Sequence, residues 1–163
     1  MNAFRIRPAT GEDARVLAHM LVEAANWNPV RARSRVTVLE DRAVMRYVDG
    51  WQRPGDFGCV AEDARGVPVG ACWARLFPAN APGRGFVAVG VPELTLGVFA
   101  QWRAQGAGRA LLRELGAAAA ARGHARLSLS VHRGNFAQRL YLSEGYVTVA
   151  SLDDTDTMVR TVR

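Results

Sequence analysis

Two glycines, Gly106 and Gly108, stand between an apolar segment that ends near Val98 and an apolar pattern with helical spacing. Residues 98–112 therefore predict a strand, a turn and a helix in immediate succession. The first amides of a helix have no partner within the helix and lie at the positive end of its dipole. Glycine leaves such amides uncovered, so this turn is predicted to bind an anion of the phosphate or pyrophosphate type.

The spacing in this turn excludes two common phosphate-binding patterns. No Gly-Lys-Ser/Thr follows, as a P-loop would require. The third glycine and the later acidic residue of a dinucleotide-binding fingerprint are also absent. What remains is the pattern Arg/Gln-x-x-Gly-x-Gly/Ala, formed by Arg103, Gly106 and Gly108.

A second motif lies downstream, at residues 135–146, where Asn135 is followed by Leu-Tyr141 and then by Gly-Tyr. Together the two motifs resemble those of the GNAT N-acetyltransferase superfamily, and the resemblance covers essentially the whole chain. Two departures are mild: Ala104 replaces a more usual glycine, and Ala100 a more usual proline. Asn135 also lies six residues before Tyr141, where many relatives have seven.

The resemblance implies that acetyl-CoA is the co-substrate and that its pyrophosphate is held by the amides of the glycine turn. Its pantetheine arm would pair with the strand that ends near Val98, and Gly97 would permit a bulge there. That bulge would free the amide of Val98 or Phe99 for the thioester carbonyl; alternatively, Gly97 only fills a packing gap. The implied cofactor-binding residues are Val98, Phe99, Arg103, Ala104, Gln105, Gly106, Ala107, Gly108, Arg109 and Asn135.

The resemblance also suggests catalytic residues. Tyr141 stands at the position of the family's general acid, where it would protonate the departing thiolate; otherwise it is a core residue. Glu93 stands where relatives often have a carboxylate that acts as a base through water, although it could simply be solvated. His132 and Ser130 are weaker candidates.

The sequence says less about the residues that would bind the acceptor amine. In this fold the connector between the first two helices often walls the acceptor pocket, so Trp27 and Arg31, with Arg33 and Arg35, are candidate substrate-binding residues. Arginines there would suit an amine that also carries a carboxylate or phosphate. The alternative is a solvated connector. Trp73 could shape an apolar pocket or simply pack.

The elements that position these residues follow from hydrophobic periodicity and from turn and capping signals. Their order, β-α-α-β-β-β-α-β-α-β, predicts one α/β domain of the α+β type over residues 1–163, with a GNAT-like, mostly antiparallel twisted sheet flanked by helices. The expected strands are 4–6, 57–62, 67–76, 93–99, 127–131 and 146–149, with residues 86–89 as a candidate for an additional short strand piece. The expected helices are about 11–25, 37–52, 108–122 and 135–144.

Composition narrows the function further. The net charge of +6 comes from 21 arginines with no lysine, but they are scattered along the chain, which argues against nucleic-acid binding. No apolar run is long enough for a membrane span, and the N-terminal segment lacks a signal core, so a cytoplasmic protein is expected. Cys59 and Cys72 lack metal-ligand spacing and are expected to be buried thiols, though they could face each other across a hairpin. No metal site is expected.

The leading hypothesis is a cytoplasmic N-acetyltransferase that transfers acetyl from acetyl-CoA to a primary amine by direct attack. The acceptor could be a small molecule or a peptide, and a homodimer is possible. The alternatives are a non-catalytic acyl-CoA-binding or regulatory domain of the same fold and, more weakly, a basic nucleic-acid binder.

Overall fold

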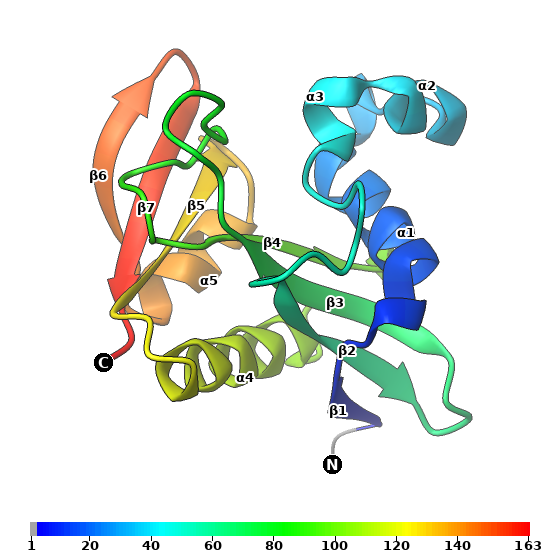
Figure 1. Cartoon of the computed structure of the whole chain (residues 1–163). Helices are drawn as coiled ribbons and strands as arrows, with labels where there is room; N and C mark the ends of the chain where they lie inside the picture. The colour runs from blue at the N-terminus through cyan, green and yellow to red at the C-terminus, as the bar shows by residue number, and fades with distance from the viewer. Residues whose placement is uncertain (1–2) are drawn as a thin grey trace.

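A computed structural model describes residues 3–163, and the first two residues of the N-terminal segment discussed above lie outside that range. A seven-stranded mixed sheet, in the order β1-β2-β3-β4-β5-β7-β6, forms the centre of the molecule. Helices α1, α2 and α3 lie on one side of it, and α4 and α5 on the other (Figure 1). The elements are β1 (Phe4–Pro8), α1 (Ala14–Ala25), α2 (Arg35–Glu40), α3 (Arg42–Met45), β2 (Phe57–Asp63), β3 (Pro68–Arg75), β4 (Glu93–Val98), α4 (Ala107–Ala121), β5 (Arg126–His132), α5 (Ala137–Ser143), β6 (Val147–Leu152) and β7 (Thr155–Thr161), with short 3-10 turns at Gly11–Asp13, Pro29–Arg31 and Ala100–Trp102.

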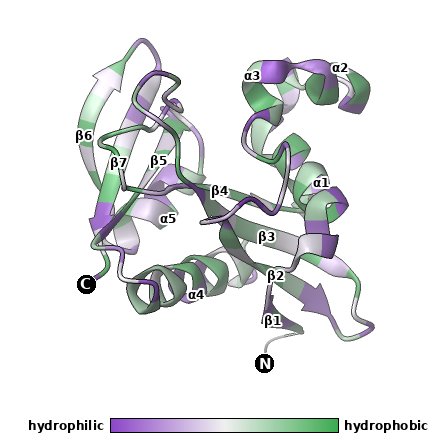
Figure 2. Cartoon of the chain, viewed as in Figure 1, coloured by the Kyte–Doolittle hydropathy of each residue, from purple (hydrophilic) through white to green (hydrophobic). Residues whose placement is uncertain are grey.

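Two hydrophobic cores sandwich the sheet because successive strand residues point to opposite faces. On β2 and β3, Val60 and Ala71 face the core that contains Leu17 of α1, whereas Cys59 and Cys72 face the core beneath α4. Helices α1 and α4 carry hydrophobic and hydrophilic residues side by side, as helices that bury one face do (Figure 2). The mixed sheet flanked by helices that the sequence predicts is confirmed.

The sheet opens in the middle. Strands β1 to β4 pair antiparallel, as do β5, β7 and β6. Within residues 3–163, these two halves meet at one parallel pairing, between Glu93 of β4 and Ser128 of β5. The Ser128 amide donates to the Pro92 carbonyl at 3.0 Å. Beyond this point β4 and β5 diverge, which leaves the far end of β4 without a partner on that side.

Several predicted elements need correction. The second helix is divided, because Asp41 ends α2 and its side chain caps the amide of Ala43 in α3. This helix begins earlier than expected, with Ser34 rather than Thr37 at its N-terminus as the cap. Residues 86–89 are not a strand but part of the loop between β3 and β4. Strand β7 has no counterpart among the expected elements. At the start of the first helical segment, Thr10 and Asp13 form a capping box.

The two cysteines are free, buried thiols, as predicted. Cys59 and Cys72 lie directly opposite each other in the β2–β3 ladder. The Cys59 thiol donates to the Leu111 carbonyl at 3.5 Å. Burial raises the pKa of Cys59 to about 12 and that of Cys72 well above its usual range. Both are therefore protonated residues of the core below α4.

Gly97 does not form the bulge expected of it. The β3–β4 register runs without a shift from Arg75↔Glu93 to Gly70↔Val98. A Cβ on Gly97 would lie 2.1 Å from the carbonyl oxygen of Met20 in α1. This glycine is therefore required where the backbone of α1 approaches the sheet. Of the two roles considered for Gly97, the structure supports packing and not a bulge.

Replacing Gly97 by alanine is expected to destabilise the protein by about 1–3 kcal/mol, because the backbone of α1 must move to admit the methyl group. Urea unfolding measures the loss. Gly11→Ala is the matched control, since its Cβ would have no neighbour nearer than 4.0 Å. Equal stability of the two variants would contradict the close approach of α1 to β4.

Candidate active site

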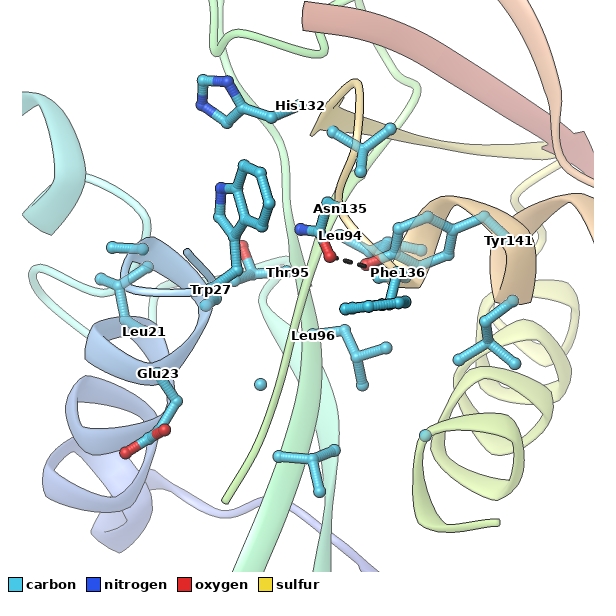
Figure 3. Close-up of a pocket in the computed structure, with 18 of the residues that line it drawn as sticks. Leu21, Glu23, Trp27, Leu94, Thr95, Leu96, His132, Asn135, Phe136 and Tyr141 are labelled. Atoms are coloured by element: carbon cyan, nitrogen blue, oxygen red, sulfur yellow. Dashed lines mark hydrogen bonds between the residues drawn. The ribbon is translucent and has the colours of Figure 1, made fainter. Parts of the chain in front are cut away.

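The opening between β4 and β5 is the entrance to a cavity of about 870 Å³. Side chains from α1, α3, β4, β5, α4 and α5 line it, together with residues of the loop that follows β3. Figure 3 shows Leu94, Thr95 and Leu96 along its floor, with Trp27 on one side and Tyr141 on the other. Candidate residues that lie far apart in the sequence therefore line one cavity.

The glycine turn lies at one end of this cavity. Gly106 caps the N-terminus of α4 with φ of 90°, and no side chain caps the first amides of that helix. Ala104, also a lining residue, has φ of 61°, a left-handed conformation that is unusual without glycine. A Cβ on Gly108 would lie 3.0 Å from a methyl carbon of Leu140, so glycine here also lets α5 pack closely against α4. The uncovered amides at the cavity end can bind an anion.

Not every residue of the predicted pyrophosphate-binding turn, residues 103–109, lines the cavity. Arg103 and Arg109 line it, but Gln105 and Ala107 do not. The Gln105 side chain donates to the Gln101 carbonyl at 2.8 Å, and Ala107 is buried in the core beneath α4. A contribution from either could come only through its backbone amide.

Carboxylates of the protein partly neutralise the two arginines of the predicted pyrophosphate-binding turn. Arg103 lies 3.6 Å from the carboxylate of Glu23 on α1, and it contacts the Val98 carbonyl at 3.4 Å. Arg109 donates to Ser143 at 3.1 Å and forms an ion pair with Glu144. Because Glu144 also binds Arg113, it ties α4 to the end of α5. Arg109 thus has a structural role in addition to lining the cavity.

The unpaired end of β4 presents Val98 rather than Phe99 to the opening. The Phe99 amide donates to the Val69 carbonyl of β3 at 3.0 Å, so it is occupied. Successive amides along a strand point alternately toward one neighbouring strand and the other. Since the Phe99 amide points toward β3, those of Leu96 and Val98 face away from it. Of the two amides predicted to be available to a thioester carbonyl, only that of Val98 faces the gap.

Glu93 is a buried carboxylate in the cavity wall, with 3% of its surface exposed. Its Oε2 accepts a hydrogen bond of 2.7 Å from the Tyr47 hydroxyl, and the Gly85 amide also stabilises the ionised carboxylate, while Oε1 is buried beside Gly83. Burial raises the pKa of Glu93, and the Tyr47 hydrogen bond partly opposes this. The environment favours a carboxyl group that exchanges a proton closer to neutral pH than an exposed glutamate does. The solvated alternative is therefore wrong.

Tyr47 was not among the candidates because its helical spacing indicates only a buried helix face. Its hydroxyl also accepts from the Arg84 amide at 2.8 Å, and its pKa is raised by burial and by Glu93. Trp73 donates from its indole to the Tyr47 carbonyl at 2.9 Å. Trp73 itself is 1% exposed and lies in the α1 core, outside the cavity, which corrects its assignment as a substrate-binding residue.

A buried ion pair fixes the backbone on both sides of Tyr47. Arg75 and Asp56 are both buried and are joined by two hydrogen bonds of 2.7 and 3.1 Å. Arg75 also donates to the carbonyls of Arg46 and Asp49, at 2.9 and 2.7 Å. The segment that carries Tyr47 is therefore held against the end of β3, and Tyr47 is held against Glu93.

Tyr141 extends from α5 toward Asn135 (Figure 3). It lines the cavity although only 6% of its surface is exposed. Its ring packs edge-on against Tyr146 with centroids 5.9 Å apart. Burial raises the pKa of Tyr141, so its hydroxyl stays protonated at neutral pH. Asn135 also lines the cavity, and its Oδ1 accepts from the Ala137 amide at 2.9 Å, which starts α5.

Some of the predicted acceptor-binding residues line the cavity and others do not. Trp27 lines the cavity and stacks on His132 with ring centroids 5.9 Å apart. His132 in turn lies 3.5 Å from the carboxylate of Asp154. Ser130 and Arg33 also line the cavity. Arg31, by contrast, is exposed outside it, as a solvated connector residue would be.

The sequence family agrees with this geometry. A family model described as an acetyltransferase (GNAT) domain matches residues 54–148, more than half of the chain. The chain belongs to the GNAT acetyltransferase family. No curated protein sequence matches it. Among described helices, none has the length and hydrophobicity needed to cross a membrane.

Solved structures of GNAT proteins share the fold over nearly the full chain. PaiA N-acetyltransferase from Thermoplasma acidophilum, in complex with coenzyme A, is 16% identical with a TM-score of 0.70, over 98% of this chain and 99% of that one. Ribosomal-protein-alanine N-acetyltransferase from Brucella melitensis is 25% identical with a TM-score of 0.69, over 96% and 99%. The structure of yncA from Salmonella typhimurium, with its cofactor acetyl-CoA, is 20% identical with a TM-score of 0.69, over 99% and 95%.

The left-handed Ala104 offers a test of the turn at the head of α4. Ala104→Val is expected to cost about 1–3 kcal/mol, because a β-branched residue is strained at positive φ. In Ala104→Gly, relief of strain and the greater freedom of the unfolded chain oppose each other, so stability should change by less than about 1 kcal/mol. Urea unfolding measures both. A valine variant as stable as the glycine variant would show that the turn does not hold this conformation.

Proposed function

We propose that this GNAT protein is an N-acetyltransferase that transfers the acetyl group of acetyl-CoA to a primary amine by direct attack. The observation that carries the proposal is the continuity of the cavity. It contains both the uncovered amides at the head of α4 and the buried carboxylate of Glu93. An anion site and a proton acceptor are thus brought together by the opening between β4 and β5.

The residues of the cavity fit acetyl-CoA. The amides that follow Gly106 would hold its pyrophosphate, with Arg103 adding charge from the side. The Leu96 and Val98 amides along the unpaired edge of β4 can donate to carbonyl oxygens of an extended arm, and Asn135 lies on the opposite wall. Acetyl-CoA supplies the activated thioester; the protein supplies position and proton transfer.

Two proton transfers are needed, and each has a residue placed for it. A protonated amine loses two protons when it becomes an amide, one of them before attack. The raised pKa of Glu93 suits it to accept that proton, and a water molecule would relay it because Oε1 is buried beside Gly83. The departing thiolate, with a reference pKa of about 8.5, takes one proton from Tyr141. The second amine proton leaves to solvent. Glu93 then releases its proton to solvent and Tyr141 regains one, so each turnover releases one proton in total.

The first test joins binding with turnover. Acetyl-CoA and CoA are each expected to raise the melting temperature, and acetyl-CoA is expected to release thiol when a panel of amines is added. Tyr141→Phe should lower kcat by roughly 100-fold, the usual contribution of a general acid, with CoA affinity little changed. Tyr146→Phe is the control, because its buried hydroxyl has no hydrogen-bond partner in the described chain and lies outside the cavity.

The outcomes separate the hypotheses. Absence of stabilisation by either form of the cofactor would exclude both the enzyme and the acyl-CoA-binding alternative. Stabilisation without thiol release from any amine would favour the non-catalytic domain. If Tyr141→Phe turns over like Tyr146→Phe, another group protonates the thiolate.

The pH dependence tests the role of Glu93. The acidic limb of kcat/KM should lie above the ordinary glutamate pKa, because burial raises the pKa of Glu93. The Tyr47 hydrogen bond stabilises the ionised carboxylate and so lowers that pKa. Tyr47→Phe removes the donor, and the acidic limb should therefore move to still higher pH. A Tyr47→Phe profile that superimposes on that of the parent protein would show that Glu93 is not the base.

A further inference from the structure

Most charged side chains in the cavity wall are already neutralised by partners in the protein. Arg103 pairs with Glu23, and Arg109 pairs with Glu144. Arg33 lies 3.0 Å from the carboxylate of Asp41. In each of these three cases a carboxylate of the protein already offsets part of the charge of the arginine.

Two lining residues of opposite charge remain. Arg84 and Glu93 both line the cavity, and neither takes part in an ion pair within residues 3–163. They are linked through Tyr47, whose hydroxyl accepts from the Arg84 amide at 2.8 Å and donates to Glu93 at 2.7 Å. The backbone of Arg84 is thus two hydrogen bonds from the carboxylate, and its side chain is long enough to serve the same ligand.

The loop that carries Arg84 is held in place. Arg46 donates to the carbonyls of Ala81 and Pro82 and lies over the ring of Phe77, 4.8 Å from its centroid. Gly83 packs so closely on Glu93 that a Cβ there would lie 2.2 Å from Oε1. Burial raises the pKa of both Glu93 and Tyr47; the charges of Arg46 and then Arg84 lower that of Glu93, and the charge of Arg84 lowers that of Tyr47.

We propose that the acceptor is a small amine that carries a carboxylate a few bonds from its amino group, as a free amino acid does, and that Arg84 binds this carboxylate. The inference rests on the proposed N-acetyltransferase function, and it names the acceptor class and the residue that selects it. A planar guanidinium binds a carboxylate through two parallel hydrogen bonds, which favours arginine for this task. Glu93 is then near the amine of the same molecule. A peptide N-terminus lacks the adjacent carboxylate and is disfavoured.

The test compares matched acceptors with acetyl-CoA as donor. The twenty common amino acids, their carboxamides and their decarboxylated amines are assayed for thiol release with the parent protein and with Arg84→Gln, Arg84→Lys and Arg65→Gln. Arg65 is an exposed arginine in the β2–β3 turn, outside the cavity, and serves as the control. Calorimetry with the best acid and its amide, in the presence of CoA, gives a readout that does not depend on turnover.

The parent protein should use at least one acid with a kcat/KM about tenfold or more above that of its amide, mainly through KM, as loss of a charged hydrogen bond predicts. Arg84→Gln should reduce this ratio toward one, because the acid loses the guanidinium that binds its carboxylate whereas the amide loses no such partner. Arg84→Lys should restore part of the ratio, and Arg65→Gln should leave it unchanged. Calorimetric affinities should follow the same order.

Other results overturn the inference. Amides or decarboxylated amines used as well as the acids would show that no carboxylate is recognised. An acid preference that survives Arg84→Gln would assign recognition to another group. Thiol release from amides alone would contradict the acceptor class but leave the proposed enzyme intact, whereas no release from any amine would contradict both.

Discussion

The divergence of β4 from β5 is the constraint on which the rest of the structure depends. A continuous sheet would satisfy the backbone of β4 on both sides and would leave no space between its two halves. Here the pairing ends after Glu93 and Ser128, so the amides of Leu96 and Val98 face a cavity. The cost of unpaired backbone is tolerable only where water or a ligand can reach it. The opening and the ligand site are therefore one feature.

A second constraint fixes the side chains around this opening. The buried pair of Arg75 and Asp56 would be costly if its hydrogen bonds were incomplete, but Arg75 also donates to two carbonyls in the segment that follows α3. Since that segment contains Tyr47, the need to satisfy a buried charge also sets the position of the Glu93 partner. The hydrogen bonds of one buried ion pair thus determine where Tyr47 and Glu93 lie in the cavity wall.

The sequence predicted those parts of the site that depend on local conformation. Gly106 at the start of a helix and the positions of Glu93 and Tyr141 on their elements follow from turn and motif signals. It failed where contacts between distant segments decide. Tyr47 and Arg84 have ordinary local patterns, and only the folding of the loop over β4 brings them together. Strand β7 shows the alternation of a strand, but its buried Asp156 obscures that pattern until Arg133, Gln138 and Ser151 are seen to bond it.

By itself, then, the sequence determined the family, most of the elements through residue 149 and the glycine turn at the head of α4, because each rests on residues close together in the chain. The tertiary structure decided which arginines lack a carboxylate partner, and that Trp27 rather than Trp73 lines the cavity. It also decided that Gly97 serves packing and that the Val98 amide, not that of Phe99, faces the gap. These depend on strand register and on the approach of α1 to β4, which no short stretch of sequence encodes. Charge compensation likewise becomes visible only when side chains distant in sequence meet.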